Sequence, residues 1–224
     1  MLCERIQNYD KAINIFEDFY DSLPSKNKIE SIVFLYGFYI KHKKYKNGYL
    51  FYKNKISQSK DPYIIEMISN NSLFKLKKLF CFLYLSINND NEIEINETLN
   101  KDEIIKEISN EFNFLISNEN EANYGENCIK DNLSILFNIL DELNQIEIFE
   151  KIYYDLEKKM LKEIKIIDGY KNIISEIKFF LGNYYFKNKS YKNCISLYED
   201  SLKYLSSSSN NDKIKNLILI KLSE

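Results

Sequence analysis

The clearest structural signal in the chain is SEIKFFLGNYYFKNKSYKNCISLYEDSLKYLSSS, residues 175–208. It holds Tyr191, the small residue Cys194 and the aromatic Tyr198, after a helical stretch that carries Gly182. A small side chain lets its helix approach the preceding helix closely, and the aromatic four positions later fills the groove on the same face. Gly182 allows the same approach from the first helix. The stretch therefore predicts two closely packed helices.

The same pattern of tyrosine, small residue and aromatic occurs twice more, at 9–16 and 45–52. These two copies are 36 residues apart at every position. A plain helical bundle with aromatics in its core is the alternative, but three copies favour a repeat. The positions expected to pack within the repeats are Tyr9, Ala12, Phe16, Tyr45, Gly48, Tyr52, Leu181, Gly182, Tyr185, Tyr191, Cys194 and Tyr198.

These residues resemble the tetratricopeptide repeat (TPR), a helix–turn–helix unit of about 34 residues. Residues 175–208 match its pattern best. Residues 29–62 match less well, with Tyr36 and Lys55 where the family has small residues, and Phe19 departs in the same way in the first copy. The resemblance implies an α-solenoid of antiparallel helix hairpins.

The fold class expected for the whole chain is all-α, a TPR-like superhelix with a loop-rich, acidic interruption. Only 5 Gly and 2 Pro are present, which nearly excludes a β-sandwich or barrel. Asp131 and Asp168 are expected to cap helix N-termini. Three regions are predicted: two TPR-like hairpins in 1–62, the first truncated; divergent helices with acidic, Asn-rich loops in 63–130; and TPR-like hairpins in 131–224, clearest at 175–208, ending in a partial repeat.

The two ends of the predicted solenoid lack caps. Aligned to the repeat, Met1 falls inside a first helix, and residues 212–224 open a further first helix with no second. An uncapped repeat exposes its apolar face. We therefore expect either a fragment of a longer solenoid or another protein that covers both ends.

Charge is distributed unevenly along the chain. Residues 41–80 contain 10 Lys against 2 acidic residues, and residues 87–126 contain 11 acidic residues against 2 Lys. Two docking surfaces of opposite sign would explain this, but a solvated basic helix face beside an acidic, partly disordered insertion, with pairing between the two as an option, is favoured. The formal net charge of −2 argues against nucleic-acid binding driven by bulk electrostatics.

Residues suited to catalysis, metal binding or cofactor binding are sparse. The single histidine, His42, is flanked by lysines and is expected to be solvated. No sequence neighbour completes a catalytic pair, no zinc-ligand spacing occurs, and no phosphate-binding loop motif is present. We therefore expect a non-enzyme without metal or cofactor.

Four cysteines without short pairing predict reduced thiols in the cytoplasm. The most apolar run, 73–87, carries three lysines, so no membrane insertion is expected.

The TPR resemblance implies that the first helix of each hairpin lines a concave groove for an extended peptide or a partner helix. Repeats that hold chaperone C-termini use Lys and Asn one turn apart, but here Phe179 replaces the Lys beside Asn183. An apolar groove for a partner helix or neighbouring subunit fits better; burial of these aromatics between hairpins is the alternative. The predicted groove positions are Val33, Phe34, Gly37, Ile40, Lys41, Phe179, Asn183, Phe186 and Lys187.

Two functional hypotheses follow. The first is a non-catalytic scaffold within a multi-protein assembly; the layout of the chain resembles the TPR-bearing subunit of the TRAPP vesicle-tethering complex, which implies vesicle-mediated transport. The second is a stand-alone TPR-type receptor that reads a charged peptide or protein tail with the lysines of residues 41–78. The partner is a protein in both cases. A charge-reading receptor would lose affinity as salt rises, whereas an apolar interface would barely respond.

Overall fold

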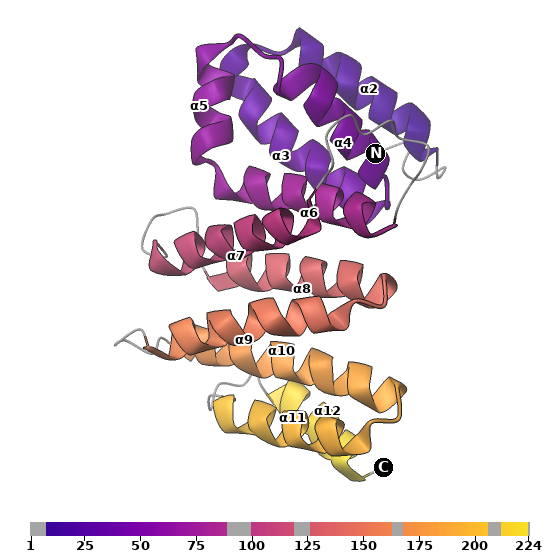
Figure 1. Ribbon diagram of the computed structural model, residues 1–224, viewed down its shortest axis with the longest axis vertical. Coiled ribbons are helices and arrows are strands. Elements are labelled where there is room, and N and C mark those ends of the chain that lie inside the picture. The colour runs from indigo at the N-terminus through magenta and orange to yellow at the C-terminus, as the bar shows by residue number, and fades with distance from the viewer. Residues whose placement is uncertain (1–7, 89–99, 119–125, 163–167, 206–211, 224) are drawn as a thin grey trace. The chain divides into compact units, whose positions relative to one another are not determined.

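The computed structural model describes residues 8–88, 100–118, 126–162, 168–205 and 212–223, and every regular element in these ranges is a helix (Figure 1). The prediction of an all-α chain is therefore confirmed for these residues. The truncated helix expected at Met1 lies outside the described residues, and so do most of the acidic, Asn-rich loops.

The chain divides into two compact units, residues 1–111 and 112–224, and the division falls within α7 (Lys101–Ser117). The prediction that Asp131 caps a helix is wrong, because α8 begins at Glu126 and continues through that position. The other helices of the first unit are α2 (Tyr9–Ser22), α3 (Ser25–Lys41), α4 (Tyr45–Phe51), the π-helical turn η1 (Tyr52–Ile56), α5 (Pro62–Asn70) and α6 (Ser72–Asn88). Those of the second are α8 (Glu126–Glu142), α9 (Ile146–Lys162), α10 (Asp168–Lys187), α11 (Tyr191–Tyr204) and α12 (Asp212–Ser223).

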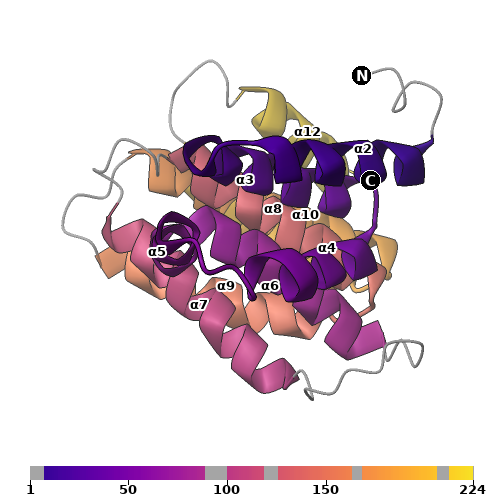
Figure 2. The same ribbon diagram turned by 90° about the horizontal axis from the view of Figure 1, so that it is seen from above.

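Helix α3 is the centre of the first unit, since α2, α4, α5 and α6 all pack against it; Figure 2 shows α2 lying along α3. The rings of Tyr36 and Phe74 meet edge to face at 5.4 Å, and the Tyr36 hydroxyl donates to the Gly48 carbonyl at 2.8 Å. A Cβ atom at Gly48 would lie 2.9 Å from Sγ of Cys81 and 3.2 Å from the ring of Tyr39. The small residue therefore lets α4 approach α3 and α6 together.

In the second unit α8, α9 and α10 lie side by side, and α11 packs closely on α10 (Figures 1 and 2). The reason for the close α10–α11 contact is visible at Gly182, where a Cβ atom would lie only 2.5 Å from the ring of Tyr198. Farther along the interface the buried Ser201 hydroxyl donates to the Ser175 carbonyl at 2.7 Å. Small side chains thus occupy both ends of this contact.

One turn geometry recurs at three connections, those of α3–α4, α8–α9 and α10–α11. Each connection contains one residue in the left-handed region, Lys43, Asn144 or Lys189, with φ of 57°, 53° and 60°. In each, the next residue donates its backbone N–H five residues back, as Ser190 does to the Tyr185 carbonyl at 2.9 Å. This is the Schellman pattern of helix C-termini. The three helix pairs therefore share one backbone connection, although none has glycine at the left-handed position.

This turn makes Lys189→Gly a stabilising substitution. A left-handed backbone costs a residue with a Cβ atom about 1 kcal/mol, and glycine removes that cost, so the free energy of unfolding is expected to rise by about 1 kcal/mol. Lys151→Gly is the matched control: Lys151 is exposed in the interior of α9, where glycine is expected to cost about 1 kcal/mol. Urea denaturation of both variants measures the difference. Equal destabilisation by the two glycines would contradict the left-handed turn.

A buried ionic cluster joins α9, α10 and α11. Lys178 is 5% exposed, and its Nζ lies 3.1 Å from Oε1 of Glu157, itself 8% exposed, and 3.4 Å from Oδ2 of Asp200. The rings of Tyr154 and Tyr204 face the same ammonium group at 6.0 and 5.9 Å. Charges this deeply buried are retained only when they are paired, so the cluster makes the stability of the second unit depend on Lys178.

Candidate partner-binding groove

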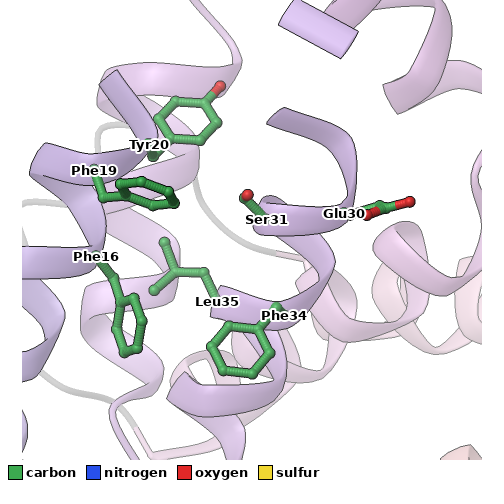
Figure 3. Close-up of a pocket in the computed structure, with 7 residues that line it drawn as sticks. All are labelled: Phe16, Phe19, Tyr20, Glu30, Ser31, Phe34 and Leu35. Atoms are coloured by element: carbon green, nitrogen blue, oxygen red, sulfur yellow. The ribbon is translucent and has the colours of Figure 1, made fainter. Parts of the chain in front are cut away.

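An apolar groove of about 410 Å³ lies between α2 and α3 in the first unit (Figure 3). Figure 3 shows the side chains of α2 on one side and those of α3 on the other. The lining residues are Phe16, Phe19, Tyr20, Glu30, Ser31, Phe34 and Leu35.

The short connection between α2 and α3 forms the groove. Helix α2 starts directly after the cap residue Asn8, whose side chain accepts the backbone N–H of Lys11 at 3.1 Å. It ends at Ser22, Leu23 follows, and Pro24 directly precedes α3 with φ −59° and ψ 147°, values that a proline ring favours but a helix interior does not allow. Because only two residues separate the helices, the last turns of α2 lie beside the first turns of α3.

The groove has exposed aromatic walls over a buried floor. Phe19 is 56% exposed and Phe34 is 55% exposed, whereas Tyr20 and Leu35 are buried. Half-buried Phe16 meets the ring of Phe34 edge to face at 5.5 Å. An exposed cluster of bulky aromatic side chains is unusual on a soluble monomer and indicates an interaction surface.

Two polar residues lie at the edge of the groove. The Ser31 hydroxyl donates to the Asn27 carbonyl within α3 at 3.1 Å. Glu30 is the one charged residue of the lining, and Figure 3 shows its side chain directed away from the rings. Burial, followed by the nearby carboxylates of Asp21 and Asp61, raises the pKa of Tyr20 to about 12, so this phenol is neutral at physiological pH.

Of the five groove positions predicted on α3, Phe34 alone lines this groove. Ile40 is buried in the core, and Lys41 is exposed. Val33 and Gly37 both face α6: the Val33 carbonyl accepts from Nζ of Lys77 at 3.3 Å, and a Cβ atom at Gly37 would lie 3.2 Å from the same Nζ.

The positions predicted on α10 lie mainly within a packed interface. Phe179 and Phe186 are partly buried against a core cluster that includes Ile218 of α12. Asn183 accepts the Tyr198 hydroxyl at 2.7 Å, and Lys187 is exposed. These two phenylalanines therefore lie between helices, in agreement with the alternative of burial between hairpins.

The predicted packing positions are mostly enclosed. Ala12, Tyr45, Gly48, Leu181, Gly182, Cys194 and Tyr198 are buried, and Tyr9, Phe16, Tyr52 and Tyr185 are partly buried. Tyr191 differs, since it is 55% exposed. Its ring meets the Phe186 ring edge to face, with the ring centroids 6.0 Å apart. Position 191 therefore begins α11 at the surface, where half of the side chain remains open to solvent.

Many lysines of the basic region 41–80 contact other parts of the same chain. Ion pairs join Lys44 to Asp10 at 2.7 Å, Lys55 to Asp21 at 2.5 Å and Lys75 to Glu111 at 3.0 Å. Lys78 lies over the ring of Tyr52 at 4.9 Å, and burial lowers its pKa. The pair of Lys75 with Glu111 joins the basic region 41–80 to the acidic region 87–126 at one point.

The prediction that His42 is solvated needs correction. Its ring stacks on Tyr9 at 4.1 Å and lies 4.4 Å from the ring of Phe38, so it packs the end of α3 against the start of α2. The two lysines beside it hid this contact, since stacking depends on a residue 33 positions earlier in the sequence.

Metal-binding groups, membrane-spanning helices and disulfides are absent from the described ranges. No group of three His, Cys, Asp or Glu side chains there could hold a metal ion. None of the helices in those ranges is both long enough and apolar enough to cross a membrane. Cys81, Cys128 and Cys194 form no disulfide there.

Sequence reasoning missed most of the groove lining, namely Phe19, Tyr20, Glu30, Ser31 and Leu35. One signal was present: Phe19 stands where the repeat has a small residue, so the close helix contact of the repeat was not to be expected at this position. The structure places it at the surface as a wall of the groove.

No protein-family model, curated protein or solved structure matches the chain.

Proposed function

We propose that this chain is a non-catalytic scaffold for protein–protein interaction, built as a TPR-like α-solenoid and acting as a subunit of a multi-protein assembly. The aromatic groove between α2 and α3 carries the proposal, because Phe19 and Phe34 expose more than half of their side chains there. Aromatic side chains of this kind dominate binding energy at protein interfaces.

The repeat architecture is supported by two observations. The connections α3–α4, α8–α9 and α10–α11 have the same left-handed turn and the same backbone hydrogen bonds. Gly48 and Gly182, small residues of the sequence pattern, lie where a Cβ atom would collide with a neighbouring helix. The layout of the chain makes a vesicle-tethering complex the first assembly to test.

The alternative of a receptor for a charged peptide has less support. Lys44, Lys55 and Lys75 are paired with carboxylates of the same chain, which reduces the net positive charge that a ligand would meet. Partner binding that weakens steeply with salt would revive this alternative, since exposed charges are screened at high ionic strength.

The Phe34→Ala substitution tests the proposed function. Truncating a central aromatic at an interface costs about 2 kcal/mol or more, so partner affinity is expected to fall about thirtyfold. The tagged full chain, wild type and variant, is purified from its own cells in low and high salt, and the co-purifying proteins are quantified. Wild type is expected to retain a stable partner set that Phe34→Ala loses.

Phe114→Ala is the matched control, because Phe114 is an exposed phenylalanine (44%) on α7 and does not line the groove. It should leave the partner set unchanged. Recovery of the wild-type protein alone and monomeric would rule out the subunit role. Equal loss of partners in both variants would remove the groove as the binding surface.

A further inference from the structure

The charge around the α2–α3 groove is largely compensated at one end. The ammonium of Lys28 lies 4.9 Å from the centroid of the Tyr20 ring. The same ammonium stabilises the negative charge of Asp61. Asp21 at the same end is paired with Lys55 at 2.5 Å. A ligand bound at this end would therefore contact the aromatic side chains and little net charge.

The remaining edge of the groove is acidic. Within the described part of the chain, Glu30 forms no ion pair, although Lys26 lies one helical turn before it on α3. Asp18, which directly precedes the groove residue Phe19 on α2, is not part of the lining, and its charge interacts with that of Lys55. Glu30 is therefore the charged group that the groove edge offers to a ligand, and it is negative.

The groove also lacks main-chain hydrogen-bonding groups for a ligand. Both of its walls are α-helices, and near the end of α2 the carbonyls of Phe19 and Tyr20 accept the Ser22 hydroxyl and the Leu23 N–H. The Ser31 hydroxyl already donates to the Asn27 carbonyl. An extended peptide would therefore bury unpaired backbone groups, which is costly, whereas a helix satisfies its own backbone. Helix α2 has 14 residues and is about 21 Å long, enough for several turns of a partner helix.

We propose that the α2–α3 groove binds a basic amphipathic helix of a partner protein. Two bulky apolar side chains one turn apart enter between Phe19 and Phe34, and a Lys or Arg of the same helix pairs with Glu30 at the edge. This inference rests on the proposed function, because it names the chemistry of the partner at that surface.

A phage-displayed library of helical peptides of about 15 residues, selected on the full chain, tests the proposal. Enriched peptides are expected to carry apolar residues at i and i+4 and a net positive charge. Glu30→Gln should weaken the binding of the best peptide about two- to fivefold, since exposed ion pairs are weak. Phe34→Ala should weaken it about thirtyfold, whereas Phe114→Ala should leave it unchanged. Thermal unfolding of each variant verifies its fold.

Other occupants give different results, and each overturns the inference. Enrichment of neutral or acidic peptides, or affinity unchanged by Glu30→Gln, excludes charge selection. Failure to enrich any peptide excludes a helix ligand. A wild-type dimer that Phe34→Ala disperses in light scattering makes a second copy the occupant, and displacement of the selected peptide by a small apolar dye alone indicates a small-molecule site. The proposed function survives these results if Phe34→Ala still abolishes recovery of the cellular partner set, and fails if wild type recovers none.

Discussion

Lys178→Met is expected to lower the free energy of unfolding by about 3–5 kcal/mol, the cost of breaking a buried ion pair on one side. The substitution removes the ammonium group but leaves the carboxylate of Glu157 buried 3.1 Å from its former position. An uncompensated buried charge is far costlier than a lost surface contact. A loss of this size is a large fraction of the total stability of about 5–15 kcal/mol typical of a domain. Urea denaturation followed by far-UV circular dichroism measures it.

Two controls separate the buried pair from ordinary surface electrostatics. Lys203 pairs with the same Asp200 at 2.7 Å but is exposed, so Lys203→Met is expected to leave the free energy of unfolding nearly unchanged. The double variant Glu157→Leu with Lys178→Met removes both charges and should recover most of the lost stability, because a buried pair contributes little over apolar residues of similar size. Equal effects of Lys178→Met and Lys203→Met would contradict the burial of the cluster.

Gly182→Ala is expected to destabilise the protein by about 1–3 kcal/mol, the usual cost of overpacking a core. The added methyl carbon would lie 2.5 and 2.6 Å from two ring carbons of Tyr198. That ring is fully buried, and its hydroxyl donates to Asn183 at 2.7 Å, so it can move aside only by disturbing this hydrogen bond. The collision outweighs the gain of about 1 kcal/mol that alanine otherwise brings to a helix interior.

Gly37→Ala is the control for this prediction, since Gly37 is also a helix-interior glycine. Its Cβ atom would meet only Nζ of Lys77, the end of a flexible side chain, at 3.2 Å. Gly37→Ala is therefore expected to leave stability unchanged or to raise it slightly. Chemical denaturation of both variants measures the difference in their free energies of unfolding. If Gly182→Ala proves as stable as Gly37→Ala, α10 and α11 do not approach each other as closely as described.

The helical character of the chain and the need for close packing at Gly182 and Gly48 could be predicted from the sequence. Both depend on short-range spacing: residues three and four apart share a helix face, and a small residue on that face permits a close neighbour. The left-handed turns could not be predicted, because Lys43 and Lys189 have no particular preference for such a conformation. Their turns are imposed by the packing of the helices on either side.

The candidate groove was predictable at one residue only. Phe34 was expected at a binding surface, but its partner wall, Phe19, comes from the preceding helix and was expected within a repeat. Which side chains face each other across two helices depends on the rotation and crossing of those helices, and the sequence of either one does not specify these. The same reason explains why His42 was expected in solvent and lies stacked on Tyr9.

The sequence by itself determined that this chain folds into helices and that small residues at defined positions bring some of them into close contact, because helix periodicity and side-chain size act over a few residues. Tertiary structure alone decided which aromatic side chains remain exposed, which lysines are paired, and where the buried Lys178 cluster forms. Those outcomes depend on contacts between residues far apart in the chain, such as Lys178 with Glu157 and Phe34 with Phe16, and such contacts exist only after the helices have packed.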